Sequence, residues 1–279
     1  MRIWVGNGDG GSLVDGDAAR ISVLDHAVTV GDGVFETLKV IAGEPFALTR
    51  HLRRLAASAD VMGIHAPDES VIREAVGSVL RHSPADIGPL GRLRITYTGG
   101  VGPLGSDRGD AIPGLVVAAS QAQPWPTTTS TVTVPWTRNE RSAIAGVKST
   151  SYGENVVALR SAHVRGASEA LFANGRGELC EGTGTNVFVV VDGAVMTPHL
   201  GSGCLAGITR ELVLEWFAAT EAPLSIDVLA SADEVFLTSS TRNVHPVTRC
   251  DERTWDEAGP VSRALAAAFD ERAAADTDP

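Results

Sequence analysis

Two short segments constrain this chain most strongly, because each places one charged residue among apolar or small neighbours. Residues 144–159 read I-A-G-V-K-S-T-S-Y-G-E-N-V-V-A-L and contain Lys148. Residues 179–188 read L-C-E-G-T-G-T-N-V-F and contain Glu181. We expect the aliphatic stem of Lys148 to pack against protein, and the small residues after Glu181 to let a flat ligand approach the backbone.

These two side chains suggest a specific chemistry. A desolvated lysine has a lowered pKa and becomes a nucleophile towards aldehydes. A carboxylate such as Glu181 can hold a proton on an aromatic nitrogen. Pyridoxal phosphate requires both functions of its protein. Taken singly, each residue is more often an ordinary surface charge, since lysine and glutamate are mostly exposed.

Two further segments are suited to a phosphate group. Residues 207–209 (G-I-T) open an apparent helix, whose unpaired backbone N–H groups and dipole attract anions. Residues 238–241 (T-S-S-T) follow a strand-like E-V-F-L and present a row of hydroxyl donors. Each pattern alone is a weak signal. Our interpretation therefore depends on the order in which all four segments occur along the chain.

Taken together, these segments resemble the fold-type IV, or class IV, pyridoxal phosphate enzymes. That family contains branched-chain aminotransferases, D-amino acid aminotransferases and 4-amino-4-deoxychorismate lyases. The resemblance covers nearly the whole chain. Besides the two opening segments, its motifs are G-D-G-V-F-E-T-L at 31–38, F-A-L-T-R-H-L-R-R-L-A-A-S-A at 46–59, G-I-T-R-E at 207–211 and S-S-T-R-N-V-H-P-V at 239–247.

The resemblance implies a role for each matching residue. Lys148 would form the Schiff base with pyridoxal 5'-phosphate and move the proton between substrate and cofactor carbon. Glu181 would pair with the pyridine nitrogen, and Arg54 would bind the phosphate. Leu205 would pack on one face of the ring. The phosphate would also be bound by Ile208, Thr209, Ser240 and Thr241. A homodimer is implied as well.

The motifs leave the reaction open. Asn155 follows Lys148 by seven residues, which resembles the D-amino acid aminotransferase and lyase branches. We therefore predict transfer of an amino group from a small amino acid, a D-amino acid in the first instance, to a 2-keto acid. The alternative is an aminodeoxychorismate lyase that releases 4-aminobenzoate and pyruvate. A non-catalytic protein on the same fold is a third reading.

Recognition of the substrate carboxylate is a second open point. The well-known D-amino acid enzymes carry an arginine in a T-R-G motif, where this chain has Tyr97, Thr98 and Gly99. Arginine and lysine side chains suit a carboxylate. The candidates for substrate binding are Arg94, Arg92, Arg108 and Lys39, although each is also compatible with an ordinary surface charge.

Length and composition predict an α/β protein of two domains. A chain of 279 residues with 43% hydrophobic residues can bury one or two cores. By analogy with the family, we expect a smaller N-terminal α/β domain over 1–120 and a larger, β-barrel-like cofactor domain over 131–279. Residues 121–130, rich in proline and hydroxyl side chains, form the predicted linker.

Periodicity predicts the longer elements. Helices are expected over 49–62, 68–81, 155–165, 209–217 and 261–272. Strands are expected over 2–5, 92–96, 114–120, 170–173, 187–191 and 234–237. The glycine-rich residues 6–11 read as a hairpin turn. The last residues, 273–279, are expected to be frayed.

Charge and composition exclude several partners. A net charge of −11 without a basic stripe argues against nucleic acid. We find no signal peptide and no apolar run of membrane-spanning length, which predicts a cytoplasmic protein. The three cysteines form no disulfide or metal pattern and suit a reducing compartment. The seven histidines show no paired spacing either, so no metal site is expected.

Overall fold

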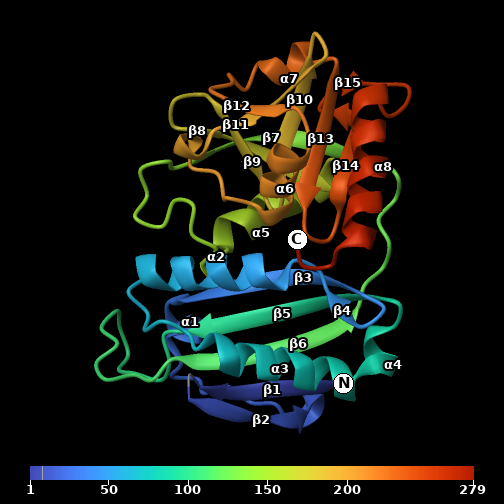
Figure 1. The fold of residues 1–279 in the computed structure, drawn as a ribbon. Coiled ribbons are helices and arrows are strands. Elements are labelled where there is room, and N and C mark those ends of the chain that lie inside the picture. The colour runs from blue at the N-terminus through green and yellow to red at the C-terminus, as the bar shows by residue number, and fades with distance from the viewer. Residues whose placement is uncertain (8) are drawn as a thin grey trace. The chain divides into compact units, whose positions relative to one another are not determined.

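A computed structural model describes residues 1–7 and 9–279, which form two compact units (Figure 1). Unit 1 comprises residues 1–124, 147–152 and 277–279, and unit 2 comprises residues 125–146 and 153–276. Residues 147–152 and 277–279, which fall inside the predicted 131–279 domain, thus belong to unit 1. Within the described residues no helix combines the length and apolarity needed to cross a membrane.

Unit 1 is built on a six-stranded antiparallel sheet with the strand order β2-β1-β6-β5-β3-β4. Its strands are β1 (Arg2–Asn7), β2 (Gly10–Asp15), β3 (Gly33–Ile41), β4 (Glu44–Pro45), β5 (Leu90–Thr98) and β6 (Gly114–Gln121). In the long pairing of β3 with β5, Phe35 lies opposite Thr96 and Thr37 lies opposite Arg94. Because side chains alternate along a strand, this register places Phe35 and Arg94 on one face of the sheet.

The opposite face of this sheet carries the core of unit 1. Helices α2 (Leu48–Val61) and α3 (Glu69–His82) pack there, and Figure 1 shows α2 beside β3. Leu52 and Leu55 of α2 are buried against Leu38 of β3, as the helical spacing of apolar residues requires. The shorter helices are η1 (Gly16–Ala18), α1 (His26–Thr29) and α4 (Pro84–Ile87).

The expected fraying of residues 273–279 is wrong. Helix α8 (Pro260–Ala275) continues to Ala275, and residues 277–279 pack within unit 1. Ala47, which precedes α2, has no side chain able to cap that helix. Asp278 accepts hydrogen bonds from the Thr49 backbone N–H at 2.8 Å and from its hydroxyl at 2.6 Å. The tail is ordered because it satisfies donors at the start of α2.

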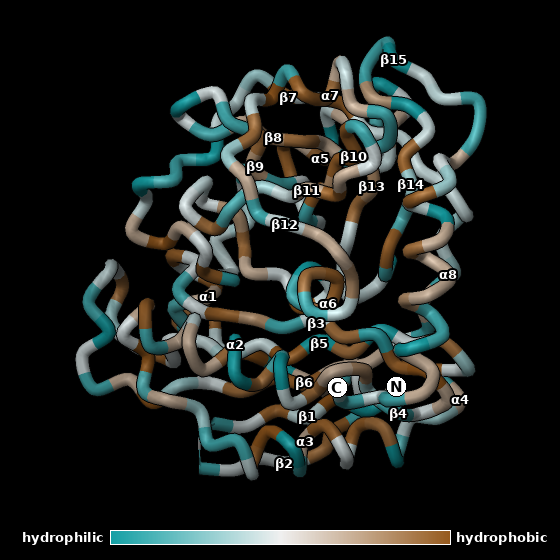
Figure 2. Tube along the Cα trace, turned by 45° about the horizontal axis from the view of Figure 1, so that its top comes forward, coloured by the Kyte–Doolittle hydropathy of each residue, from teal (hydrophilic) through white to brown (hydrophobic). Residues whose placement is uncertain are grey.

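Unit 2 is built on a nine-stranded mixed sheet in which β12-β11-β10-β13-β14-β7-β8-β9 form the main path and β15 pairs with β14. Its strands are β7 (Thr129–Arg138), β8 (Glu169–Asn174), β9 (Leu179–Gly182), β10 (Asn186–Val191), β11 (Ala194–Pro198), β12 (Ala219–Ala222), β13 (Glu234–Ser239), β14 (Asn243–Cys250) and β15 (Arg253–Thr254). Strand β7 pairs in parallel with both β8 and β14. Apolar residues follow the central strands, whereas the turn around β15 is hydrophilic (Figure 2).

Helices pack against this sheet and complete its hydrophobic cores. They are α5 (Gly153–Val164), η2 (Leu200–Ser202), α6 (Ile208–Trp216), α7 (Val228–Ser231) and α8. Ala158 and Ala162 of α5 are buried against Phe172 of β8. The two curled sheets and their helices confirm the predicted mixed α/β fold class.

Candidate functional site

Lys148 lies on a short extended segment of unit 1 that pairs with the first residues of β3, whose last residues pair with β4. The Phe35 N–H donates to the Lys148 carbonyl at 2.9 Å, and the Thr150 N–H donates to the Gly33 carbonyl at 2.8 Å. Ser149 forms an antiparallel bridge with Val34. These backbone bonds fix the position of Lys148 along β3, since a slip of one residue would turn its side chain to the other face.

The Lys148 amine lies over an aromatic ring that it shares with an arginine. Lys148 Nζ is 4.5 Å from the centroid of the Phe35 ring, and Arg94 Cζ is 3.4 Å from the same centroid. The Tyr152 ring packs edge-on to Phe35 at 5.2 Å. The ring of Phe35 therefore contacts two cations, the Lys148 amine and the Arg94 guanidinium.

A buried cluster of Glu36, His51 and Arg54 lies on the helix-covered side of β3. Glu36 is fully buried, and its Oε1 accepts from Arg54 Nε at 2.8 Å. Its Oε2 accepts from Arg54 Nη2 at 2.6 Å and bonds His51 Nδ1 at 2.6 Å. His51 and Arg54 are three residues apart on α2 and so face the same way. The predicted phosphate arginine is thus held in a two-bond fork by a carboxylate.

The charges in this cluster determine its protonation. Burial alone would raise the pKa of Glu36, but the positive charge of Arg54 and the hydrogen bonds from Arg54 and His51 hold that pKa well below its usual range. Burial lowers the pKa of His51, and the Glu36 carboxylate only partly offsets this effect. Glu36 is therefore ionised and His51 neutral near pH 7, so His51 donates through Nδ1.

The other three substrate-binding candidates have different surroundings in unit 1. Arg92 shares the exposed face of β5 with Arg94. Lys39 is buried, and its Nζ is 5.6 Å from the Phe46 ring centroid. Arg108 is held by both carboxylate oxygens of Asp32, at 2.5 and 2.6 Å, and also donates to two backbone carbonyls. Of the four candidates, Arg94 is the one that shares an aromatic ring with Lys148.

In unit 2, Glu181 at the end of β9 is fixed through both carboxylate oxygens. Its Oε1 lies 3.1 Å from Arg138 Nε, and its Oε2 accepts from the Leu205 N–H at 2.9 Å. Arg138 also donates to Asn155 Oδ1 at 3.1 Å, and Asn155 donates to the Thr183 carbonyl at 2.5 Å. These contacts connect the residues around Glu181 to the start of α5.

The loop before α6 is held by Glu181 and by Asn186, which belong to the same segment, residues 179–188. Asn186 donates to the Leu205 carbonyl at 2.8 Å, so Leu205 is fixed at its N–H by Glu181 and at its carbonyl by Asn186. A Cβ at Gly207 would lie 1.9 Å from Asn186 Oδ1, so this position requires glycine. Ile208 and Thr209 begin α6, whose N-cap Gly207 offers no side-chain acceptor. This helix start can donate backbone N–H groups to an anion.

Ser240 and Thr241 lie in the tight turn between β13 and β14. The Arg242 N–H closes the turn by donating to the Ser239 carbonyl at 3.2 Å. The buried Arg242 guanidinium stacks on Trp125 at 3.7 Å and lies 3.8 Å from Glu169 Oε2. This packing restricts the turn, so Ser240 and Thr241 lie where the central strands β13 and β14 meet.

Glu169 joins this turn to the loop that follows Glu181. The buried carboxylate accepts from the Thr183 N–H at 2.9 Å and from Thr185 Oγ1 at 3.2 Å, and it also accepts from the Thr183 hydroxyl. Its proximity to Arg242 connects the two loops through one acidic side chain. Sequence reasoning assigned no role to Glu169, Arg138 or Asn186. Only Asn186 had a visible signal, because it belongs to the T-N-V-F motif.

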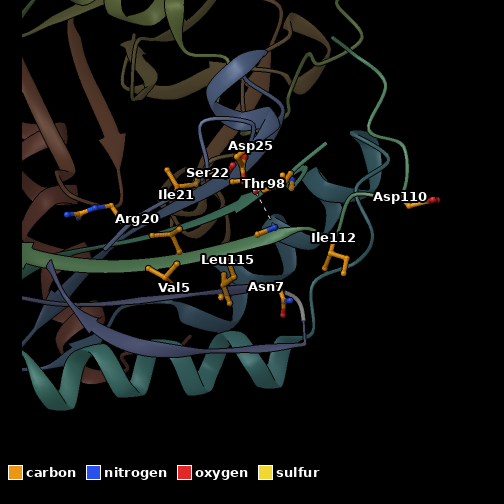
Figure 3. Close-up of a pocket in the computed structure, with 15 residues that line it drawn as sticks. Val5, Asn7, Arg20, Ile21, Ser22, Asp25, Thr98, Asp110, Ile112 and Leu115 are labelled. Carbon is orange, nitrogen blue, oxygen red and sulfur yellow. Dashed lines mark hydrogen bonds between the residues drawn. The ribbon is translucent and has the colours of Figure 1, made fainter. Parts of the chain in front are cut away.

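A separate cavity of about 460 Å³ lies in unit 1, near the loops that contain residues 20–25 and 100–112 (Figure 3). Val5 and Leu115 line it together with Ile21 and Ile112. Asp25, at its wall, accepts from the Thr98 hydroxyl at 2.8 Å. Its lining residues are Val5, Gly6, Asn7, Arg20, Ile21, Ser22, Asp25, Thr98, Gly100, Val101, Asp110, Ile112, Gly114, Leu115 and Val116. They include none of the predicted cofactor or substrate residues.

Comparisons with known proteins agree with this geometry. Residues 33–250 match the family model "Amino-transferase class IV". A Methanocaldococcus jannaschii protein with a provisional branched-chain-amino-acid aminotransferase name is 32% identical, with 93% of each chain covered. A D-alanine aminotransferase of Listeria monocytogenes is 27% identical over 90% of this chain and 88% of its own. The fold IV-transaminase CpuTA1 of Curtobacterium pusillum is 31% identical, with a TM-score of 0.85 and 97% of each chain covered.

We expect acid to destabilise unit 2 through His245 of β14. Burial first, and the Arg242 charge second, lower the pKa of His245 to about 4 from an ordinary value of 6.5. A lowered histidine pKa gives stability that is complete above 6.5 and is lost as pH falls towards 4. The free energy of unfolding of a His245→Gln variant should therefore fall less over this range, as measured by urea titration at several pH values. A His65→Gln variant, at an exposed position, should behave like the unaltered protein, and an equal slope in all three would contradict the assignment.

Proposed function

Because this chain belongs to the class IV aminotransferase family, whose members use pyridoxal 5'-phosphate, we propose that it transfers the amino group of a small D-amino acid to a 2-keto acid. The observation that carries this proposal is the position of the Lys148 amine beside the Phe35 ring that also supports Arg94. A nucleophilic amine and a carboxylate-binding cation then lie on the same small surface, as an α-amino acid requires.

The residues present fit the cofactor. Bound pyridoxal phosphate supplies an aldehyde carbon for the amine and an electron-withdrawing ring. In this proposal Lys148 is the residue that would hold that carbon and that would move the α-proton of the substrate. Glu181, held by Arg138 and the Leu205 N–H, keeps a proton on the ring nitrogen. Arg54, Ile208, Thr209, Ser240 and Thr241 would bind the phosphate, and Leu205 would pack on the ring.

Two features are consistent with a D-amino donor. Asn155 follows Lys148 at the spacing typical of the D-amino acid and lyase branches, and its side chain holds the Thr183 carbonyl beside Glu181. The relatives include D-alanine aminotransferases as well as proteins named for branched-chain amino acids. A lyase that releases 4-aminobenzoate and pyruvate is the second candidate, because it would share the Lys148 segment.

Arg94 is the residue we assign to the substrate carboxylate. Arginine is permanently charged and presents paired N–H donors that match a carboxylate. Arg94 bonds the hydroxyl groups of Thr96 and Thr37 at 3.3 and 3.5 Å, long contacts that a carboxylate could replace. Arg108 is engaged by Asp32, and Lys39 lies over Phe46, so both are less favourable.

We further propose a homodimer that assembles through an apolar surface of unit 1. This loop patch consists of Ile21, Val23, Leu24, Val28, Val30, Val101, Leu104 and Ile112, all of them exposed. Its two loops are tied together, since the His26 N–H donates to the Gly100 carbonyl at 2.9 Å. Exposed apolar side chains gathered on neighbouring loops are typical of homodimer interfaces. The buried free thiols of Cys180, Cys204 and Cys250 suit a cytoplasmic location.

The donor is tested by mixing the purified enzyme with D-alanine or L-leucine in the absence of a keto acid and recording the visible spectrum. We expect D-alanine to convert the lysine-bound cofactor to pyridoxamine phosphate faster than L-leucine does. A Lys148→Ala variant should show neither the visible absorption band of the lysine-bound cofactor nor turnover. Preference for L-leucine would overturn the D-donor proposal, and release of 4-aminobenzoate from aminodeoxychorismate would favour the lyase.

Arg94→Ala should raise the KM for D-alanine roughly ten- to hundredfold, because a charged hydrogen bond contributes about 1.5–3 kcal/mol. Steady-state kinetics measure the effect. Reaction with an amine that lacks a carboxylate should change little. Arg92→Ala is the matched control, since Arg92 lies on the same exposed strand face two residues away. A larger KM effect at Arg92 than at Arg94 would show that the wrong arginine was chosen.

The loop patch is tested by introducing charge at Val23 and Leu104, which are 78% and 77% exposed. We expect the paired Val23→Asp and Leu104→Asp substitutions to convert a dimer to a monomer in sedimentation equilibrium. Val164→Asp, at a position 81% exposed on α5, is the control and should leave the mass unchanged. An unchanged mass in the double variant would remove this surface from the proposed interface.

A further inference from the structure

Glu36 is a fully buried carboxylate that the proposed reaction does not use. Its neighbours along the same face of β3 are the apolar core residues Val34 and Leu38. An ionised carboxylate in such surroundings is strongly destabilising unless cations and hydrogen-bond donors surround it. Arg54 and His51 provide both, so the sequence retains a charged cluster where an apolar side chain would otherwise pack.

The geometry of the cluster restricts Arg54. A guanidinium group carries five N–H donors in a rigid planar fork. Glu36 accepts from Nε at 2.8 Å and from Nη2 at 2.6 Å, which fixes the plane of the group and its rotation. The Nη1–Nη2 edge of the same group has the spacing suited to two oxygens of a phosphate. His51 bonds Glu36 Oε2 at 2.6 Å and so holds the carboxylate in turn.

We propose that Glu36 is a positioning residue for phosphate recognition. It acts through Arg54 by presenting the Nη1–Nη2 edge to the phosphate monoester of the cofactor, and His51 holds Glu36 in place. This inference rests on the proposed role of Arg54. Glu36 cannot bind the phosphate itself, because two negative charges repel. Its effect must therefore depend both on the phosphate and on the guanidinium of Arg54.

The test compares two ligands of the full-length protein after removal of its cofactor, pyridoxal phosphate and pyridoxal. Glu36→Gln keeps the shape of the side chain but removes its charge. It should weaken pyridoxal phosphate binding roughly ten- to hundredfold and leave pyridoxal binding nearly unchanged. Equal weakening of both ligands would indicate a merely structural role and would overturn the proposal.

Glu234→Gln is the matched control. Glu234 is also a buried carboxylate, but it accepts from the backbone N–H groups of Val261 and Ser262 at 2.9 and 2.7 Å. Its loss should not change the ratio of the two affinities. If Glu36→Gln fails to fold, substitutions of His51 provide a second test of the same proposal. His51→Leu should lower the ratio, and His51→Asn, which keeps a donor near the Nδ1 position, should restore part of it.

A combined variant separates this inference from the function beneath it. Arg54→Ala should abolish the preference for pyridoxal phosphate over pyridoxal, and adding Glu36→Gln should then have no further effect on that preference. If Arg54→Ala leaves the preference intact, the assignment of Arg54 to the phosphate is wrong. If Arg54→Ala lowers it but neither Glu36→Gln nor His51→Leu does, the positioning role of Glu36 is wrong and the role of Arg54 stands.

Discussion

The pairing of residues 148–150 with the first residues of β3 is the interaction on which the rest of the unit 1 site depends. Two backbone hydrogen bonds and one bridge set its register. That register places the Lys148 amine over Phe35, and the antiparallel neighbour β5 brings Arg94 to the same ring. Residues 148–150, far along the chain, are thus positioned by β3, a strand that is buried along most of its length.

Buried carboxylates organise both units. Glu36 fixes an arginine and a histidine in unit 1, and Glu169 fixes the Thr183–Thr185 loop in unit 2. In each case one carboxylate accepts hydrogen bonds from several groups that belong to other segments of the chain. A single carboxylate can therefore restrict two loops or two side chains at once, which favours rigid placement of the groups around a small ligand.

The sequence predicted the long elements well because their periodicity is strong. The helix expected over 49–62 is α2 at Leu48–Val61, and that expected over 209–217 is α6 at Ile208–Trp216. Family resemblance also identified Lys148 as a candidate, whereas Arg94 was one of four candidates chosen because arginine and lysine suit a carboxylate. It could not identify Glu36 or Glu169 as organisers, because a buried acid and an exposed one look alike in sequence. The docking of residues 277–279 was missed for a similar reason, since Asp278 caps a helix more than two hundred residues away.

The assembly of unit 1 from residues 1–124, 147–152 and 277–279 has a consequence for biosynthesis. Its sheet can form early, since residues 1–124 supply every strand of the six-stranded order. Residues 147–152, which contain Lys148, emerge from the ribosome later. Residues 277–279, which include the cap of α2, emerge after all of unit 2. Domains that fold during synthesis ordinarily complete themselves in chain order. Here unit 1 reaches its final form only after translation has passed residue 277, so a nascent chain that stalls before that point retains an incomplete unit 1.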